Sequence, residues 1–95
     1  MAAEKKFENK IKKYLKSKGA WVLKYWGGSV YTQAGVPDLL VCYKGKFIGI
    51  EVKAETGHAS ELQLHTIDDI KKSGGIAFVL FPKDYDKFVE WFNTL

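Results

Sequence analysis

Two carboxylates in this sequence stand where a β-hairpin would bring them together. Two apolar runs, residues 35–43 and 46–53, flank a two-residue turn that ends in Gly45, and this is the pattern of a hairpin. A turn centred there places Asp38 directly opposite Glu51, with their Cβ atoms about 4.5–5.5 Å apart. Opposed like charges destabilise a sheet unless a cation compensates them. The spacing therefore predicts a site for a hard divalent cation.

A lysine joins this pair of carboxylates. Alternate residues of a strand point to opposite faces, so Lys53 shares a face with Glu51, whereas the apolar residues beside them point to the other face. A surface hairpin with a solvated Glu-Lys pair would show the same spacing. The apolar neighbours of both acids, and the stiff entry that Pro37 gives the first run, favour the metal site.

Length and composition indicate one small soluble domain, residues 1–95. Ninety-five residues suffice for a single compact domain with one core. No run reaches the roughly 18 apolar residues of a membrane span, and residues 1–13 are too charged for a signal peptide. Cys42 is the single cysteine. An internal disulfide is therefore excluded, and a cytoplasmic protein without membrane association is predicted.

The charge balance fits a polyanionic partner. The formal net charge is +4 and the pI is about 9.1, and all fifteen basic residues are lysines. Lysines meet phosphates as flexible point charges and lack the planar fork with which arginine reads guanine edges. The composition therefore favours recognition of a nucleic-acid backbone and its shape over recognition of its sequence.

Apolar residues at helical spacing predict a first helix over residues 3–17, closed by Gly19. Glu8 borders the apolar stripe of this helix. It is either a solvated charge paired with Lys12 or an acid that points into the site, and the sequence leaves both interpretations open.

A first strand is predicted over residues 20–26, followed by a segment rich in small residues, 27–34. If that segment is a mobile loop at the mouth of the site, its small residues would let a nucleic-acid backbone approach closely. An ordinary connection between strands fits the segment equally well.

A second helix should begin near Glu61, because Ser60 and Gln63 have the spacing of a capping box. It should end at residues 74–75, a pair of glycines. Gln63 would lie on the inward side of the first turn, next to the strand that carries the metal site. Its amide would there orient the lysine of that strand or a phosphate oxygen, although capping alone would explain this residue.

The last part of the chain predicts a buried strand over residues 76–81 and a final helix capped by Asp84. The apolar face of that helix is broad enough to pack against a second subunit. The element order is α-β-β-β-α-β-α, and a helical crossover should make the fourth strand parallel to the third. The fold class is therefore α/β, with a mixed four-stranded sheet flanked by helices.

These motifs resemble the PD-(D/E)xK nuclease superfamily, with its restriction-endonuclease-like core. Pro37-Asp38 matches the first half-motif, and the run from Glu51 to Lys53 matches the second. The small size and the helix that begins with Ser60 and Gln63 are most similar to the VRR-NUC (virus-type replication-repair nuclease) domain, which is like Holliday junction resolvases. The resemblance spans nearly the whole chain.

The resemblance implies hydrolysis of phosphodiester bonds that depends on Mg²⁺, with Mn²⁺ as a substitute. The residues it implies as metal ligands are Asp38, Glu51, the backbone carbonyl of Val52, and Glu8. Lys53 would stabilise the attacking hydroxide or the developing charge, and Gln63 matches a glutamine of the second helix. This agrees with elementary chemistry, because a metal ion lowers the pKa of bound water and polarises the phosphate.

The resemblance further implies a homodimer that acts on branched DNA in a bacterial or phage-infected cell. A four-way junction has two-fold symmetry and this short chain carries one site, so paired cleavage needs two copies. Two alternatives remain at this point. One is a nuclease that processes flaps, nicks or ends, and the other is a non-catalytic DNA-binding module.

Overall fold

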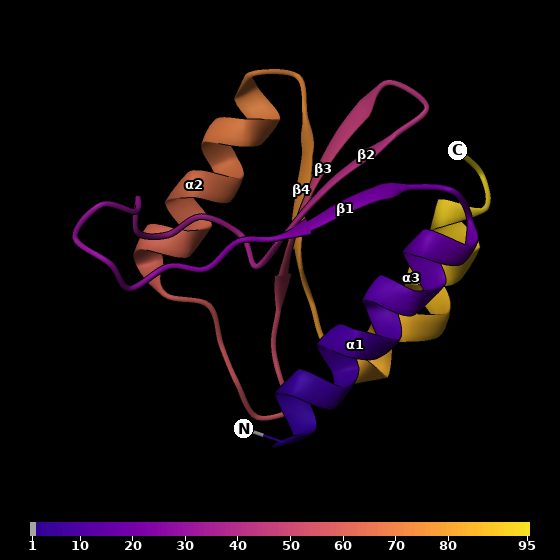
Figure 1. The fold of residues 1–95 in the computed structure, drawn as a ribbon, viewed down its shortest axis with the longest axis horizontal. Coiled ribbons are helices and arrows are strands. Elements are labelled where there is room, and N and C mark those ends of the chain that lie inside the picture. The colour runs from indigo at the N-terminus through magenta and orange to yellow at the C-terminus, as the bar shows by residue number, and fades with distance from the viewer. Residues whose placement is uncertain (1) are drawn as a thin grey trace.

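A computed structural model describes residues 2–95 and shows one four-stranded sheet with helices on both faces (Figure 1). The strand order is β1-β2-β3-β4, in which β1, β2 and β3 are antiparallel neighbours and β4 is parallel to β3. The elements in chain order are α1 (Ala2–Ser17), β1 (Trp21–Lys24), β2 (Leu39–Tyr43), β3 (Lys46–Val52), α2 (Glu61–Lys72), β4 (Ile76–Leu80), a short 3-10 helix η1 (Pro82–Asp84) and α3 (Tyr85–Phe92). The mixed α/β sheet predicted from the element order is confirmed.

The hairpin of β2 and β3 has the predicted register. Tyr43 pairs with Lys46, and the ladder runs to the pair of Leu39 and Ile50. Lys44 and Gly45 both have positive φ, 50° and 79°. This is the left-handed backbone that a two-residue turn needs to match the twist of its strands. The turn therefore fixes which residues of the two strands lie side by side.

The crossover from β3 to β4 passes through α2, whose start is fixed by its cap. The Ser60 hydroxyl accepts a hydrogen bond from the backbone N–H of Gln63, and the Gln63 side chain accepts one from the backbone N–H of Ser60. The predicted capping box is thus confirmed. It places the first turn of α2 beside the end of β3.

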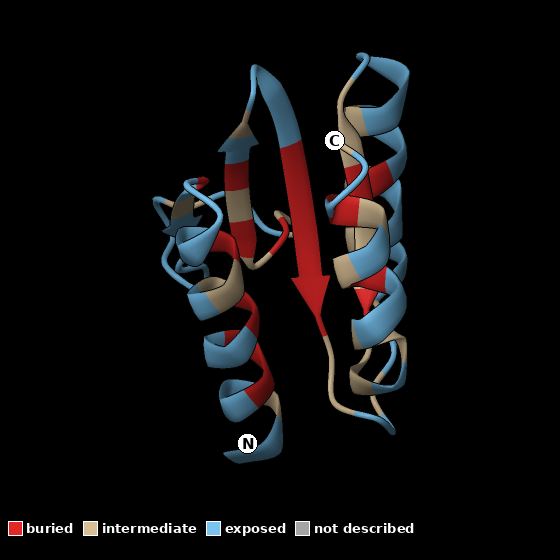
Figure 2. Cartoon of the chain, turned by 90° about the vertical axis from the view of Figure 1, so that its right-hand side faces the viewer, coloured by how far each residue is buried: buried red, intermediate tan, exposed pale blue. Residues whose placement is uncertain are grey.

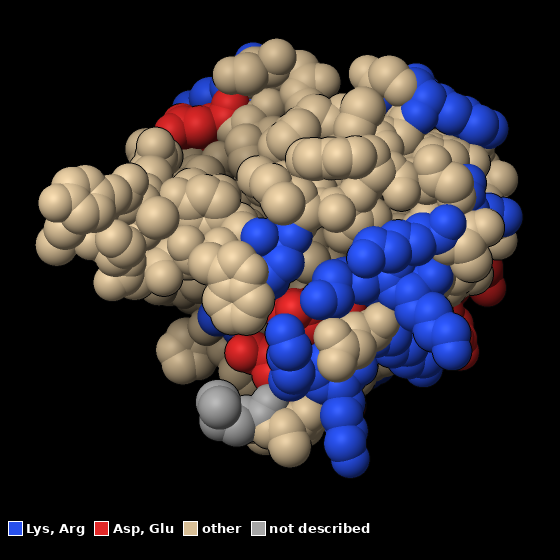
Figure 3. Space-filling model, in the orientation of Figure 1, with Lys and Arg blue, Asp and Glu red and all other residues tan. Residues whose placement is uncertain are grey.

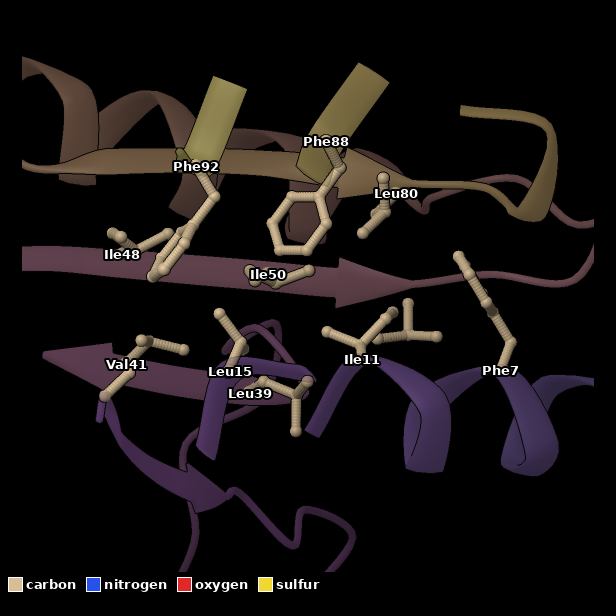
Figure 4. Close-up of a cluster of buried hydrophobic side chains, with 12 residues drawn as sticks. Phe7, Ile11, Leu15, Leu39, Val41, Ile48, Ile50, Leu80, Phe88 and Phe92 are labelled. Atoms are coloured by element: carbon tan, nitrogen blue, oxygen red, sulfur yellow. The ribbon is translucent and has the colours of Figure 1, made fainter. Parts of the chain in front are cut away.

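The hydrophobic core lies between the sheet and the pair α1 and α3. Figure 2 looks onto this side and shows β3 running buried between the two helices. In Figure 4, side chains of α1 and α3 meet over Ile48 and Ile50 of β3. Phe88 and Phe92 of α3 are buried there. The apolar face of α3 therefore packs within the chain, where the sequence had suggested a second subunit.

Several predicted boundaries were wrong by a few residues. β1 ends at Lys24, before Trp26, and β4 ends at Leu80. Asp84 stands at the N-cap position of α3 but its side chain makes no capping hydrogen bond. Between residues 2 and 95, no helix has the length and apolar character needed to cross a bilayer.

The segment between β1 and β2 is an ordered connection that rests on α2. The Tyr25 hydroxyl accepts a hydrogen bond from the backbone N–H of Gln33 and donates one to its carbonyl. Gly35 has a φ of +82°, and a Cβ atom there would lie 2.7 Å from the Leu62 side chain. The close approach explains why a glycine stands at this position.

Candidate active site

Asp38 is held at the start of β2 by backbone contacts on two sides. Its backbone carbonyl accepts a hydrogen bond of 2.8 Å from the N–H of Tyr25. Its carboxylate Oδ2 accepts one of 2.9 Å from the N–H of Val52. The ladder of β2 and β3 has the predicted register and ends at the pair of Leu39 and Ile50, directly next to Asp38 and Glu51. Beyond this last pair, Asp38 bonds to Val52 through its side chain.

Glu51 is the most deeply buried charged residue of the site, with 2% of its surface exposed. Its Oε2 accepts a hydrogen bond of 2.8 Å from the Gln63 amide and lies 3.2 Å from the Lys53 ammonium. Its Oε1 is buried and has no hydrogen-bond partner among the described residues. Burial, and next the negative charge of Asp38, raise the pKa of Glu51 to about 7. The two carboxylates therefore lie close enough to repel one another, as the hairpin predicted.

A divalent cation fits the oxygen atoms of this site. A buried carboxylate oxygen without a partner is costly, and a nearby second carboxylate adds to the cost. Mg²⁺ prefers oxygen ligands, usually one or two carboxylates with water. Across residues 2–95, no three His, Cys, Asp or Glu side chains lie together as a ready metal cluster. The set present is therefore Asp38 and Glu51, with the peptide of Val52 beside Asp38.

Glu8 is also buried, with 4% of its surface exposed, but lysines surround it. The ammonium of Lys24 lies 2.7 Å from Glu8, that of Lys5 lies 3.2 Å away, and that of Lys12 lies 3.5 Å away. Burial alone would raise the pKa of Glu8, but the hydrogen bonds from Lys24 and Lys5 outweigh it and hold that pKa below its usual value. Of the two interpretations of Glu8, the solvated charge is wrong, although its pairing with Lys12 is present.

Lys24 joins Glu8 to the pair of Asp38 and Glu51. Its ammonium bonds to Glu8 and lies 3.5 Å from Oδ1 of Asp38. Although burial alone would lower the pKa of Lys24, the two acids hold it above its usual value, so it stays charged. Glu8 is thereby placed next to Asp38 through a lysine, and it does not join Asp38 and Glu51 as a third carboxylate.

Sequence analysis did not identify Lys24 as a site residue. The alternation of side chains along β1 does contain a signal, because it places Lys24 on the same face as Val22, which packs against the core. A lysine that points inward from a strand needs an acidic partner. The alternation of β1 could thus have identified Lys24 as the partner of an acid such as Glu8.

Gln63 combines the two roles that the sequence left open. Its side-chain oxygen completes the capping box with Ser60, and its amide nitrogen donates to Glu51. The predicted target of this amide, Lys53 or a phosphate oxygen, differs from the carboxylate that it contacts. Lys53 contacts the same carboxylate oxygen, Oε2. The other oxygen of Glu51 is thereby left for a cation.

The surface charge surrounds these acids with lysines. Figure 3 shows lysine side chains gathered over α1 and a small acidic patch among them. A cluster of positive charge around a partly screened acidic site suits a phosphodiester backbone that must approach a bound cation. The electrostatics and the donor atoms thus point to the same class of substrate.

Comparison with known proteins agrees with this arrangement. A family model described as archaeal Holliday junction resolvase (Hjc) matches residues 2–90. The chain belongs to the Hjc family. No significant match was found among curated protein sequences. The family match supports the resolvase-like nuclease that the motifs indicated, and the narrower VRR-NUC label stays a prediction.

A solved Hjc structure shows the same fold. It is Hjc from Archaeoglobus fulgidus, described as a Holliday junction resolvase from an archaeal hyperthermophile, and it matches this chain with a TM-score of 0.62 and 20% identity. The match covers 81% of this chain and 66% of that chain, just under two thirds. At this identity the likeness between the two Hjc chains concerns the fold: a mixed four-stranded sheet flanked by helices.

Proposed function

We propose that this chain is a divalent-metal-dependent endonuclease that cleaves branched DNA, most of all four-way junctions. The observation that carries the proposal is that the buried Oε1 of Glu51, beside Asp38, has no hydrogen-bond partner among residues 2–95. The family match to Holliday junction resolvases supports the substrate class. Residues 1–95 would form one nuclease domain, of the VRR-NUC type within the PD-(D/E)xK superfamily.

The metal would be held by Asp38, Glu51 and the backbone carbonyl of Val52, and Mg²⁺ suits these oxygen donors. When bound, it supplies a hydroxide at neutral pH and a positive charge at the phosphate. Gln63 keeps Glu51 in place through its amide. Lys53, whose ammonium lies 3.2 Å from Glu51, would stabilise the negative charge that develops on the attacked phosphate.

Glu8 and Lys24 would act on the other side of Asp38. The pair keeps one ammonium group 3.5 Å from the Asp38 carboxylate. We assign Lys24 to binding a phosphate oxygen next to the scissile bond, and Glu8 to positioning Lys24. The role of Glu8 as a direct metal ligand, which the family resemblance implies, would require Lys24 to leave this position.

We further propose that the active form is a homodimer, because symmetric cleavage of a junction needs two sites. A surface supports this proposal. Trp21 of β1, Cys42 of β2 and Phe47 of β3 are opposed neighbours on the sheet face that points away from the core. Trp21 is 58% exposed and Phe47 is 44% exposed. We call these three residues and Leu23 the outer sheet patch.

Cleavage of a labelled four-way junction tests the proposal, with a flap and a linear duplex as parallel substrates. We expect paired nicks in Mg²⁺, none in EDTA, and a loss of at least about a hundredfold in rate for Lys53→Ala, since such a charge acts mainly in the transition state. Lys46→Ala replaces an exposed lysine at the start of β3, the strand that Lys53 directly follows; it is the matched control and should cut normally.

Two other outcomes would each replace the proposal. Cleavage of flaps or ends alone would identify the alternative nuclease that processes such structures. Binding of every substrate without cleavage in Mg²⁺ or Mn²⁺ would identify a non-catalytic DNA-binding module.

A further inference from the structure

One large aromatic side chain next to the candidate site has no role in the core. Trp26 follows β1 and is 70% exposed. The ammonium groups of Lys5 and Lys24 lie 5.2 Å and 5.3 Å from the centre of its ring. Both lysines also bond to Glu8, and Lys24 reaches Asp38. A single exposed tryptophan is ordinary, but here both of its charged neighbours belong to the site.

The backbone next to Trp26 is anchored beside Asp38. The residue before it, Tyr25, donates its N–H to the Asp38 carbonyl at 2.8 Å. The Tyr25 hydroxyl is in turn held by both backbone groups of Gln33. The ring is therefore presented to solvent from an anchored segment, so little ordering is needed when a ligand arrives.

The ring and its two lysines could together bind a single nucleotide. Aromatic side chains stack on nucleobases, and neighbouring lysines meet the phosphate of the same nucleotide. In a continuous duplex both faces of each base are already stacked. A free base face exists only where the DNA branches, ends or is unpaired. A tryptophan at this place would thus distinguish a branch point from the interior of a duplex.

We infer that Trp26 is a stacking platform for an unstacked nucleobase of DNA bound beside Asp38 and Glu51. The inference rests on the proposed function and names the feature of DNA that the site selects. Lys5 and Lys24 would hold the adjoining phosphates. The site would then recognise an exposed base face whatever the base, which agrees with a chain whose basic residues are all lysines.

The test measures binding in EDTA, which keeps the DNA uncut, with a four-way junction carrying 2-aminopurine at the branch point and a linear duplex of the same arm sequence. We expect binding of the native chain to change the 2-aminopurine fluorescence. Trp26→Leu keeps apolar bulk but removes the aromatic face, so it should abolish this change and weaken junction binding on the order of tenfold. Binding to the duplex should be unaltered.

Three controls make the test specific. Trp26→Phe should restore most of the junction binding, because it restores an aromatic face. Tyr31→Ala removes a 94% exposed aromatic side chain from the same segment and should bind the junction as the native chain does. The thermal midpoint of Trp26→Leu should equal that of the native chain, which separates loss of stacking from loss of fold.

The inference is overturned if Trp26→Leu binds the junction as tightly as the native chain, or weakens junction and duplex equally. It is also overturned if Tyr31→Ala loses as much junction binding as Trp26→Leu. These failures are separate from a failure of the proposed function, which shows as absence of cleavage by the native chain in Mg²⁺. A chain that cuts nothing and still stacks through Trp26 would keep this inference and lose the nuclease proposal.

Discussion

The protonation of Glu51 is linked to folding, and the proposed cation would compete with this proton for the carboxylate. Its ordinary pKa of 4.5 describes the unfolded chain, and burial beside Asp38 raises it to about 7 in the folded chain. Between these values the folded state binds more protons than the unfolded state, so the free energy of unfolding decreases as the pH rises. Below the lower pKa this loss of unfolding free energy is absent, and above the higher pKa it is complete.

We therefore expect the metal-free protein to lose on the order of 2 kcal/mol of unfolding free energy between about pH 5 and about pH 8. Urea unfolding in EDTA at several pH values measures this loss. Glu51→Gln, which cannot ionise, should remove most of the slope, and saturating Mg²⁺ should restore stability to the native chain at the higher pH. An unchanged slope in Glu51→Gln would show that another group causes it.

Two substitutions can separate the role of Gln63 in capping α2 from its role in positioning Glu51. Gln63→Ala removes one half of the capping box and the hydrogen bond to Glu51, whereas Ser60→Ala removes only capping. Both should lower the unfolding free energy by about 1 kcal/mol. Only Gln63→Ala should also weaken Mg²⁺ binding, by roughly tenfold or more, because only that amide supports the proposed metal ligand Glu51.

Isothermal titration of Mg²⁺ into each variant measures the difference. Equal weakening in Gln63→Ala and Ser60→Ala would mean that the helix start, and not the amide, positions Glu51. No weakening in either would remove Gln63 from the site.

At the scale of elements, the end of β1 connects α1 to the hairpin through one lysine. Lys24 bonds to Glu8 of α1 and lies near Asp38 at the start of β2. Lys24→Met should lower the unfolding free energy by about 1–2 kcal/mol. This is less than the roughly 3–5 kcal/mol for a fully buried pair, because Lys5 and Lys12 still neutralise Glu8.

A double-mutant cycle of Lys24→Met with Glu8→Gln should give a coupling of about 1–2 kcal/mol near neutral pH. The pKa of Glu8 is depressed, so this coupling should persist as the pH falls and be lost only below the ordinary value of 4.5. Lys12→Met is the control, with its ammonium 3.5 Å from Glu8 and an expected coupling below about 0.5 kcal/mol. Equal couplings for both lysines would contradict a special role of Lys24.

The elements show how far the sequence could predict this site. Turn chemistry fixed the hairpin register, and with it the meeting of Asp38 and Glu51, because a two-residue turn leaves one alignment of its strands. The capping pattern likewise predicted the start of α2. Both signals are local, which is why they could be read from a single sequence.

Features that depend on distant contacts could not be predicted in this way. Just beyond the last strand pair, the Asp38 side chain accepts a hydrogen bond from the amide of Val52, and the spacing of the hairpin residues does not predict this contact. The apolar stripe of α3 would look the same whether it covered its own core or another subunit. Glu8 was ambiguous because its main partner, Lys24, is sixteen residues away in the chain.

At the scale of the whole molecule, the two faces of the sheet are unequally covered. One face packs against α1 and α3, whereas the outer sheet patch of Trp21, Leu23, Cys42 and Phe47 stays exposed on the other. A large exposed apolar patch on a small protein marks an interaction surface. The proposed homodimer would bury this patch, and the reactivity of the Cys42 thiol would show whether the patch is covered.

Trp21→Lys should therefore convert a dimer into a monomer, as measured by light scattering at micromolar concentration. The same change should increase the rate at which a thiol reagent modifies Cys42. Lys16→Glu, an exposed charge change on the opposite helix α1, should leave the mass unaltered. A native chain that is monomeric at high concentration would refute the dimer, as would a dimer that Trp21→Lys leaves intact.

The Glu51 oxygen that finds no partner among residues 2–95 has a consequence for attempts to improve this protein by selection. Without a divalent ion, variants that replace Glu51 by a neutral residue should gain stability and lose the proposed metal ligand. A heat-resistance screen run in a chelator would thus enrich sequences that lack this acid, whereas the same screen with Mg²⁺ would retain it. The ion present during selection would decide whether robust descendants keep the proposed site.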